Sequence, residues 1–448
     1  MSPDPARPTR RLLVLGGASQ PAGADVLAQT RARDVEVCLV DTPANLAAAP
    51  ELVAAAAEVV PLDYTDAQAC LRWAREHSRR QPFLGVYGFR EPAAESVAEV
   101  AQALGLPGNP VEAVRRVRDK HSCRRGLAEH GFRQPVSALC AGQDEVLGFL
   151  RETGPGPWVI KPMGGWGSAG VSLLRDRADL DAAVRHLADG RAALSGELAR
   201  QGIDHSPAGI AAAQILVEQF QTGQEFSAEA VMVGGRPVLL AITRKITTGP
   251  PYFIETGHTL SADLPDGCWT RVQQTLSAAL PALGLRWGVM HVEFWLTGDE
   301  VVLGEVHVRP GGDYIHLMTQ HVTDVELHGV IVDQLLNVTP DPAAWQVKRG
   351  AAVRFLLPPP GRVLSIDGWD EVRADPQFLT GRLTLHPGDR VRPLNSSADR
   401  STLVVATAPT SAQAAREAAR LIAGLRVQVH SEPCPQPRRH PAVLVKES

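Results

Sequence analysis

The feature that most constrains the fold is the segment 304–313, in which a strand pattern carrying charged side chains ends in a double-glycine turn. Glu305, His307 and Arg309 alternate with valines, so a β-strand would direct all three side chains to one face. A carboxylate beside an imidazole can hold a divalent cation, and an arginine fork matches a carboxylate or a phosphate. The segment therefore predicts a strand end suited to phosphate groups and metal ions.

A second acidic strand pattern precedes this segment. The run His291-Val292-Glu293-Phe294 places another carboxylate, that of Glu293, on a strand-like stretch. Two carboxylates on neighbouring strands can bind magnesium ions that bridge the phosphates of one nucleotide. Together the two patterns predict a site at which Glu293 and Glu305 hold metal ions against a nucleotide.

Length and composition restrict the class of protein. A chain of 448 residues is expected to form two to four packed units, and a net charge of -4 without a long basic run argues against nucleic acid as a main partner. Six cysteines without Cys-x-x-Cys spacing indicate reduced thiols rather than a disulfide framework or a zinc site. No apolar run approaches membrane-spanning length, so we expect a cytoplasmic protein with no membrane partner.

The first unit, residues 1–111, has the pattern of a doubly wound α/β fold. An apolar strand at 12–17 enters a glycine turn, a helical stretch follows, and further strands are predicted at 35–41 and 84–88. Its ligand crevice is expected at the carboxyl ends of the strands. The turn at 16–23 departs from Gly-x-Gly-x-x-Gly and has a proline where the helix should begin its second turn, which disfavours NAD binding.

The second unit, residues 112–344, changes from helical to strand patterns. Residues 112–155 have helical periodicity, and 158–162 form a short predicted strand that leads into a glycine-rich hairpin loop at 163–171. A helical stretch follows, and then strands begin at 215–220, 226–233 and 238–242. The third unit, residues 345–448, carries strand patterns at 352–356 and 402–406 and a helix at 412–425, whereas 433–441 looks disordered.

Lys161 ends a buried apolar strand and precedes the glycine-rich loop. Its ammonium is therefore held where the N–H groups of the loop can converge on phosphate oxygens. The sequence is not a Walker A motif, which requires Gly-Lys-Ser/Thr at the start of a helix. A plain hairpin turn with a solvated lysine is the alternative.

Two further segments are compatible with nucleotide binding. Considered by itself, Lys120 is expected to be one more solvated lysine on the surface of a helix. The segment 218–225 leaves a buried strand, exposes the backbone of Gln219 and Phe220, and returns an acid after a glycine turn. Exposed N–H and C=O groups there can contact an adenine edge, and Glu225 can accept hydrogen bonds from ribose hydroxyls, although a surface hairpin acid is an equal alternative.

Together these motifs resemble the ATP-grasp superfamily, and in particular its carboxylate–amine (L-amino acid) ligases. They follow the family's order over about 105–330, and the matching stretches are 118–120, 159–162 with the loop 164–171, 217–225, 291–294 and 305–312. The resemblance implies an α/β chain with the ATP-grasp fold: an N-terminal doubly wound α/β domain, a central α+β ATP-binding lid at about 155–220, metal and substrate strands at about 221–344, and a C-terminal α+β catalytic region.

The resemblance also implies a role for each motif, with ATP as cosubstrate and Mg²⁺, or alternatively Mn²⁺, as metal. Arg309 steadies the acyl phosphate and the carboxylate substrate. The other implied contacts are Lys120 and Lys161 with phosphates, Gly165, Gly167, Ser168 and Ala169 of the covering loop, Glu218, Gln219 and Phe220 with adenine, Glu225 with ribose, and Glu293 and Glu305 with metal.

His307 departs from the family pattern, because the superfamily usually has an asparagine metal ligand at this position. Imidazole suits magnesium less well than an amide oxygen does. His307 is therefore a doubtful metal ligand and is instead a neighbour of the metal ligands or a substrate contact. Asp313, which follows Gly311 and Gly312, could attract the ammonium of an amine substrate or could cap the turn.

The segment 243–258 lies between the adenine and metal motifs and contains Glu255-x-x-His258. In the amino acid ligases a similar Glu-x-x-His segment lines the substrate pocket. The resemblance thus implies that Glu255 binds an α-amino group and that His258 orients a substrate or assists proton removal, while a polar loop is the alternative.

These expectations lead to an ATP-dependent ligase that joins a small carboxylate substrate to an amine through an acyl phosphate. A purine-biosynthesis or biotin carboxylase-like enzyme of the same superfamily is the first alternative. A nucleotide-binding regulatory or NAD-dependent protein is the second. The expected partners are small molecules, and the sequence leaves open whether the protein forms a homodimer.

Overall fold

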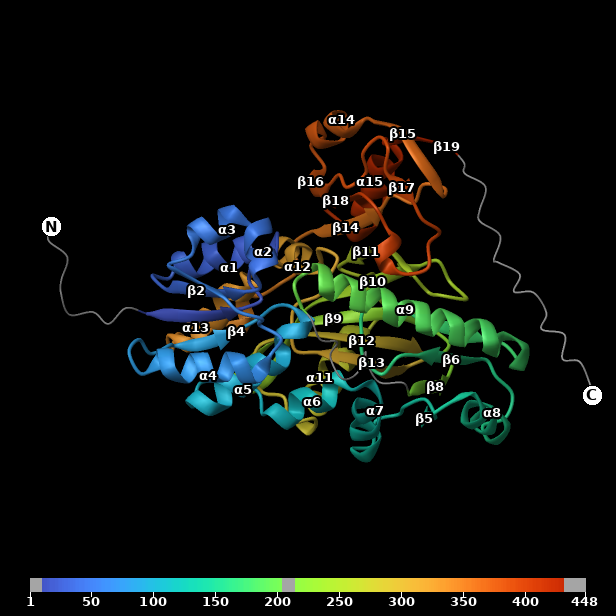
Figure 1. Cartoon of the computed structure of the whole chain (residues 1–448), viewed down its shortest axis with the longest axis horizontal. Coiled ribbons are helices and arrows are strands. Elements are labelled where there is room, and N and C mark those ends of the chain that lie inside the picture. Colours follow the sequence, from blue (N-terminus) through green and yellow to red (C-terminus); the bar gives the residue numbers. More distant parts are fainter. Residues whose placement is uncertain (1–9, 204–213, 431–448) are drawn as a thin grey trace, which may run out of the picture.

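The computed structural model describes residues 10–203 and 214–430. Figure 1 shows an N-terminal unit in blue, strands β9, β10, β12 and β13 in the middle, and a C-terminal unit in orange and red above them. No helix within these described residues is both long and apolar enough to cross a membrane. The predicted disorder at 433–441 lies outside the described residues.

The N-terminal unit is built on a parallel sheet with the strand order β3-β2-β1-β4. Its strands are β1 (Arg11–Leu15), β2 (Glu36–Asp41), β3 (Glu58–Pro61) and β4 (Gly85–Tyr87). The three predicted strands of this unit are confirmed, and β3 is a short addition that ends at a proline. Helix α1 (Ala22–Arg31) begins directly after Pro21, so the proline precedes the helix and the expectation that it falls at the second turn is wrong.

Short helices flank this sheet and lead into the next unit. They are α2 (Pro43–Ala48), α3 (Pro50–Ala55), α4 (Ala67–Ser78), α5 (Ala94–Leu104), α6 (Val111–Arg118) and α7 (Lys120–Glu129), with a 3-10 turn at Glu91–Ala93 after β4. The apolar faces of α4 and α5 pack on β1, β2 and β4.

A small antiparallel sheet with the order β5-β8-β6-β7 follows. It consists of β5 (Ser137–Cys140), β6 (Trp158–Lys161), β7 (Ser172–Leu174) and β8 (Ile215–Gln219), with α8 (Gln143–Glu152) and α9 (Leu180–Arg200). The pairing of β6 with β7 confirms the predicted hairpin around the glycine-rich loop. The expectation of purely helical structure over 112–155 is wrong, because β5 is stabilised by pairing with the distant β8, which local periodicity does not reveal.

The largest sheet has eight strands in the order β13-β12-β9-β10-β11-β14-β18-β16. They are β9 (Gln224–Val233), β10 (Arg236–Thr247), β11 (Glu255–Leu260), β12 (Val289–Thr297), β13 (Glu300–His307), β14 (Gly350–Phe355), β16 (Phe378–Arg382) and β18 (Leu403–Ala408). Helix α11 (Cys268–Ala282) packs on one face, and α12 (Ile315–Thr323) packs on the other. This sheet thus combines strands that precede residue 345, the predicted start of the third unit, with strands that follow it.

The remaining C-terminal elements pack around the end of this sheet. A second small sheet has the order β17-β15-β19, built from β15 (Gly361–Asp367), β17 (Arg390–Val391) and β19 (Arg426–His430). Helix α13 (Leu327–Leu335) packs against the N-terminal unit, and α14 (Trp369–Ala374) and α15 (Ser411–Ala423) cover β14 and β18. The strands predicted at 352–356 and 402–406 and the helix predicted at 412–425 are confirmed.

Candidate active site

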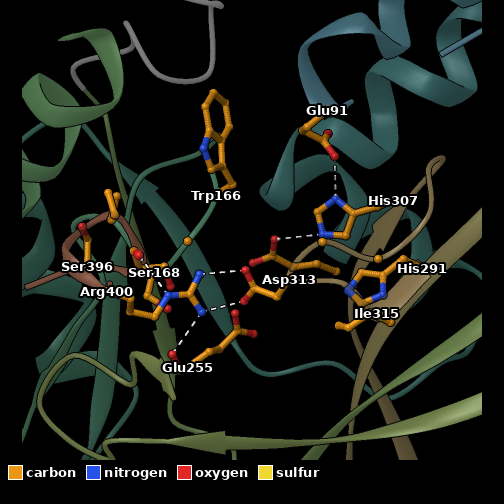
Figure 2. Close-up of a pocket in the computed structure, with 18 of the residues that line it drawn as sticks. Glu91, Trp166, Ser168, Glu255, His291, His307, Asp313, Ile315, Ser396 and Arg400 are labelled. Atoms are coloured by element: carbon orange, nitrogen blue, oxygen red, sulfur yellow. Dashed lines mark hydrogen bonds and ion pairs between the residues drawn. The ribbon is translucent and has the colours of Figure 1, made fainter. Parts of the chain in front are cut away.

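A cavity of about 850 Å³ lies where the units meet. Its walls come from the glycine-rich loop, the polar ends of the central strands, the turn after β4 and a C-terminal segment, and Figure 2 shows part of this lining. Of the site residues predicted from the sequence, only Gln219 does not line it. The cavity therefore gathers Lys120, Lys161, Gly165, Gly167, Ser168, Ala169, Glu218, Phe220, Glu225, Glu255, His258, Glu293, Glu305, His307, Arg309, Gly311, Gly312 and Asp313.

Two lysines form one end of the cavity. The Lys120 Nζ atom lies 2.5 Å from Glu305 Oε2, and Lys161 Nζ lies 2.7 Å from Glu218 Oε1 and 3.9 Å from Glu305 Oε1. Lys120 is the first residue of α7, where the side chain of Asp119 caps the helix, and Lys161 ends β6. The two ammonium groups come from separate elements to one carboxylate, which makes this end of the cavity suited to phosphate.

Glu218 is buried between two cations. Arg124 Nε lies 2.8 Å from Glu218 Oε2, and Lys161 contacts the other oxygen. Burial alone would raise the pKa of Glu218, but the charges of Arg124 and Lys161 outweigh it and lower that pKa to about 2. The carboxylate therefore stays ionised and holds Lys161 in place.

The expected free N–H groups beside the adenine motif are not found. The Gln219 N–H donates to Val136 O at 2.9 Å, and the Phe220 N–H donates to Pro157 O at 3.0 Å. The Gln219 side chain donates to Thr153 O outside the cavity. The prediction of exposed N–H groups at Gln219 and Phe220 is thus wrong, because neighbouring strands pair with them. The Phe220 ring does border the cavity and stacks on Phe253 with ring centroids 5.6 Å apart.

Lys245 is a cavity residue that the sequence analysis missed. Its buried Nζ lies 2.8 Å from Glu225, 3.0 Å from Glu255 and 2.7 Å from Glu293. Burial would lower the pKa of Lys245, but the three carboxylates raise it well above its usual value. A signal was present: the chain has only five lysines, and three of them, Lys120, Lys161 and Lys245, line this cavity.

The three predicted metal-binding side chains are not gathered into one cluster. Glu293 contacts Lys245, Glu305 contacts Lys120, and His307 Nε2 lies 3.6 Å from Glu305. Nevertheless Glu293 and Glu305 line the same cavity, and each is balanced by a lysine ammonium that an incoming cation can replace. Carboxylate oxygens are the ligands that magnesium prefers, so these two residues fit the ion.

Glu91, from the turn after β4, is a second residue that the sequence analysis missed. Its Oε2 lies 2.9 Å from His307 Nδ1 and 2.8 Å from Arg309 Nε, and its Oε1 lies 3.6 Å from Arg118. Burial would raise the pKa of Glu91, yet His307, Arg309 and Arg118 together lower it well below the usual value. The N-terminal unit thereby orients both basic side chains of the 304–313 segment.

The other end of the cavity is centred on Asp313. Its two oxygens accept from Arg400 at 2.6 and 2.8 Å, and His258 Nε2 lies 3.1 Å from Oδ2. Burial would raise the pKa of Asp313, but Arg400 and His258 lower it. Arg400 thus already neutralises Asp313 in this structure, and attraction of an amine substrate by Asp313 stays a prediction. Of the described residues, Glu255, His258 and Asp313 form the one group of three with potential metal-ligand atoms within 4.8 Å of one another.

His258 is buried, and its position limits what it can do. Because Asp313 is an acceptor, the imidazole proton belongs on Nε2. Nδ1 is buried and has no hydrogen-bond partner among the described residues. His258 therefore orients Asp313 in this structure, and its role toward a substrate stays a prediction.

Comparisons with known proteins agree with this arrangement. Three family models match the chain: the ATP-grasp N-terminal domain over residues 30–108, the ATP-grasp domain over 155–316, and the L-amino acid ligase C-terminal domain 2 over 354–430. An uncharacterized protein of Sinorhizobium fredii is 28% identical over 376 residues, which is 83% of this chain and 74% of that protein. Human carnosine synthase 1 is 27% identical over 258 residues, 55% of this chain but only 30% of that longer protein.

A solved structure is similar over nearly the whole chain. The L-amino acid ligase from Bacillus licheniformis superimposes with a TM-score of 0.74 at 22% identity, covering 95% of this chain and 100% of that one. The chain has the ATP-grasp fold and carries ATP-grasp domains over residues 30–108 and 155–316, and its curated relatives include carbon–nitrogen ligases such as carnosine synthase 1 and a D-alanine–D-alanine ligase. Within the superfamily it resembles the carboxylate–amine ligases, and the L-amino acid ligases in particular.

Proposed function

We propose that the protein joins a small amino acid-like carboxylate to an amine, using ATP and an acyl phosphate intermediate and releasing ADP and phosphate. One observation carries this proposal: a single cavity holds lysines and carboxylates that suit a nucleotide phosphate, together with Glu255 and Arg309, which suit an amino acid-like substrate. Such a cavity can bring a phosphoryl donor and a carboxylate together.

The phosphate end has the charges that phosphoryl transfer requires. Lys120 and Lys161 would contact ATP phosphates, with the loop at 163–171 lying over them. Glu293 and Glu305 would hold Mg²⁺, which when bound neutralises the charge on the transferring phosphoryl group. Because these side chains are already paired with one another, nucleotide binding exchanges existing ion pairs for new ones and little charge has to be newly buried.

Arg309 would bind the carboxylate substrate and the acyl phosphate. Its planar fork suits both groups, and Glu91 holds it from behind at 2.8 Å. Glu255 would accept the α-ammonium of an amino acid at the other end. The match of residues 354–430 to the L-amino acid ligase C-terminal domain 2 supports amino acid-like substrates.

A substrate screen tests this proposal. Phosphate release would be measured across a matrix of amino acid pairs, and the active pairs would be analysed by mass spectrometry for a new amide. Bicarbonate and phosphoribosylamine with glycine would be included as substrates of other members of the superfamily. Amide formation from an amino acid pair is the expected result, whereas turnover with only bicarbonate or phosphoribosylamine would contradict it.

An isotope experiment tests the intermediate. When the carboxylate oxygens carry heavy oxygen, one label is expected in the released phosphate, because a substrate oxygen bridges carbon and phosphorus and leaves with the phosphate. Adenylation would instead place the label in AMP. Detection of AMP, or of unlabelled phosphate during amide formation, would rule out an acyl phosphate.

A further inference from the structure

A short C-terminal segment, residues 396–400, borders the cavity at the junction of two of its loops. We call it the C-terminal turn. It contains the 3-10 turn Ser397–Asp399, which Ser396 and Asp399 stabilise through a capping box, and it ends at Arg400. Figure 2 shows Ser396 and Arg400 beside Ser168 of the glycine-rich loop and Asp313 of the loop after β13.

The C-terminal turn contacts the glycine-rich loop through its backbone. The Ser397 N–H donates to Gly167 O at 2.9 Å. Gly167 has a φ of +66°, and a Cβ atom added to it would lie 3.1 Å from the Ser397 Cβ atom. The close approach therefore depends on glycine at position 167. On its other side the loop is held by Ser168 Oγ, which donates to Phe253 O at 3.3 Å.

The same turn contacts the substrate end of the cavity through Arg400. The guanidinium donates to both oxygens of Asp313 and, at 3.1 Å, to the backbone oxygen of Glu255. Arg400 Nε donates to Ser397 O at 2.9 Å, and the guanidinium lies 3.9 Å from the centre of the Phe355 ring. Arg400 is thus fixed on all sides, and it ties the turn to Asp313 and Glu255.

We propose that the C-terminal turn fixes the position of the glycine-rich loop relative to the 311–314 loop, with Arg400 as the positioning residue. This inference rests on the proposed function for its catalytic consequence. A loop held over the phosphates and a substrate loop held by Arg400 keep water from an acyl phosphate until the amine attacks. Loosening the turn lets water cleave that acyl phosphate, which returns the carboxylate and releases phosphate without an amide.

A proline substitution tests the backbone contact. Ser397→Pro removes the N–H donor at the first position of a 3-10 turn, where proline fits the backbone, and Ser396 already has the extended conformation (ψ 171°) that precedes proline. Ser397→Ala is the matched control, because it keeps the N–H and removes a hydroxyl that has no partner among the described residues. We expect Ser397→Pro to release several times more phosphate per amide than Ser397→Ala does. Equal ratios in the two variants would overturn the role of this contact.

Substitution of Arg400 tests the link between the loops. Hydrogen exchange of the substrate-free protein would be measured in wild type, Arg400→Lys and Arg400→Gln. Because Arg400 holds Ser397, we expect Arg400→Gln to speed exchange in both 311–314 and 164–171, and Arg400→Lys to do so less. If residues 164–171 of the Arg400→Gln variant exchange at the wild-type rate, the C-terminal turn does not join the two loops. This measurement needs no substrate, so its outcome is independent of whether the ligation proposal holds.

Kinetics of the Arg400 variants distinguish positioning from general damage to the fold. Misplacing a substrate group by about 1 Å can cost roughly a hundredfold in rate, so we expect Arg400→Lys to lose about tenfold to a hundredfold in amide formation. The KM for the amino acid substrates should rise, and the KM for ATP should rise less, because Arg400 contacts Asp313 and Glu255 directly but reaches the glycine-rich loop only through Ser397. A parallel rise in both KM values would contradict a positioning role.

Discussion

Lys120 Nζ lies 2.5 Å from Glu305 Oε2, although 185 positions separate the two residues in the chain. The lysine begins α7 and the glutamate lies near the end of β13, so packing of α7 against the large sheet creates the pair. Glu293 has a matching partner in Lys245 at 2.7 Å. Each acid proposed to bind metal therefore has its own lysine counter-ion, and this pattern motivates the first two predictions.

Glu305→Gln should abolish ligation while the protein stays folded, because it removes the negative charge of a proposed metal ligand near a partly exposed strand end. We expect a loss of at least about a thousandfold in turnover at saturating magnesium, as removal of charge stabilisation in phosphoryl transfer typically produces. Circular dichroism would check the fold. Glu300→Gln, at the exposed start of the same strand, is the matched control and should retain activity. Near-normal turnover of folded Glu305→Gln would refute the metal assignment.

Lys245→Met should destabilise the protein strongly. The substitution leaves Glu225, Glu255 and Glu293 without their shared cation, and breaking a buried ion pair from one side costs about 3–5 kcal/mol. Urea unfolding measures this effect. Lys348→Met is the control, since its ion pair with Asp324 lies at the surface and should contribute little to stability. Equal midpoints for the two variants would mean that Lys245 does not balance the three acids.

Arg309→Lys should impair use of the carboxylate substrate and not ATP binding. A lysine keeps the positive charge but cannot reproduce the planar fork that matches a carboxylate or acyl phosphate. We expect amide formation to fall strongly while the ATP affinity measured by calorimetry changes little. Arg115→Lys, in a surface ion-pair cluster, serves as the control. A large loss of ATP affinity with unchanged carboxylate binding would assign Arg309 to the nucleotide.

Glu218 should make stability depend on pH in the acid range. Burial opposes its ionisation, but Arg124 and Lys161 lower its pKa to about 2, whereas the ordinary value is 4.5. A lowered carboxyl pKa stabilises the folded state above the unfolded-state pKa, and this stabilisation is lost as the pH falls from about 4.5 through about 2.

The Glu218→Gln variant lacks this titration. Its deficit in unfolding free energy relative to wild type should therefore be largest above pH 4.5 and should narrow by about 3 kcal/mol toward pH 2, given 1.36 kcal/mol per pKa unit. Denaturant unfolding of both proteins at several pH values measures the difference. A deficit that stays constant across this range would show that the Glu218 pKa is not lowered by folding.

Many strands and most of the candidate site could be predicted because they leave local patterns in the chain. Buried strands such as β1 appear as continuous apolar runs, and the alternation of Glu305, His307 and Arg309 indicates one face of a strand whatever its neighbours are. The glycines around Lys161 likewise mark a tight loop by their conformational freedom. These local patterns, together with the resemblance to the ATP-grasp family, identified a set of residues of which nearly all line one cavity.

Partners could not be predicted, because they come from segments that are distant in the chain. No local pattern shows that Pro157 and Val136 accept the N–H groups of Phe220 and Gln219, or that β5 pairs with β8. Glu91 and Arg400 lie in short turns without periodicity, yet packing of the units brings them to Arg309 and Asp313. The sequence thus determined which chemical groups the strands and loops present, whereas the tertiary structure decided which charges neutralise one another. Charge pairing depends on distances in space, and the periodicity of strands and helices does not encode those distances.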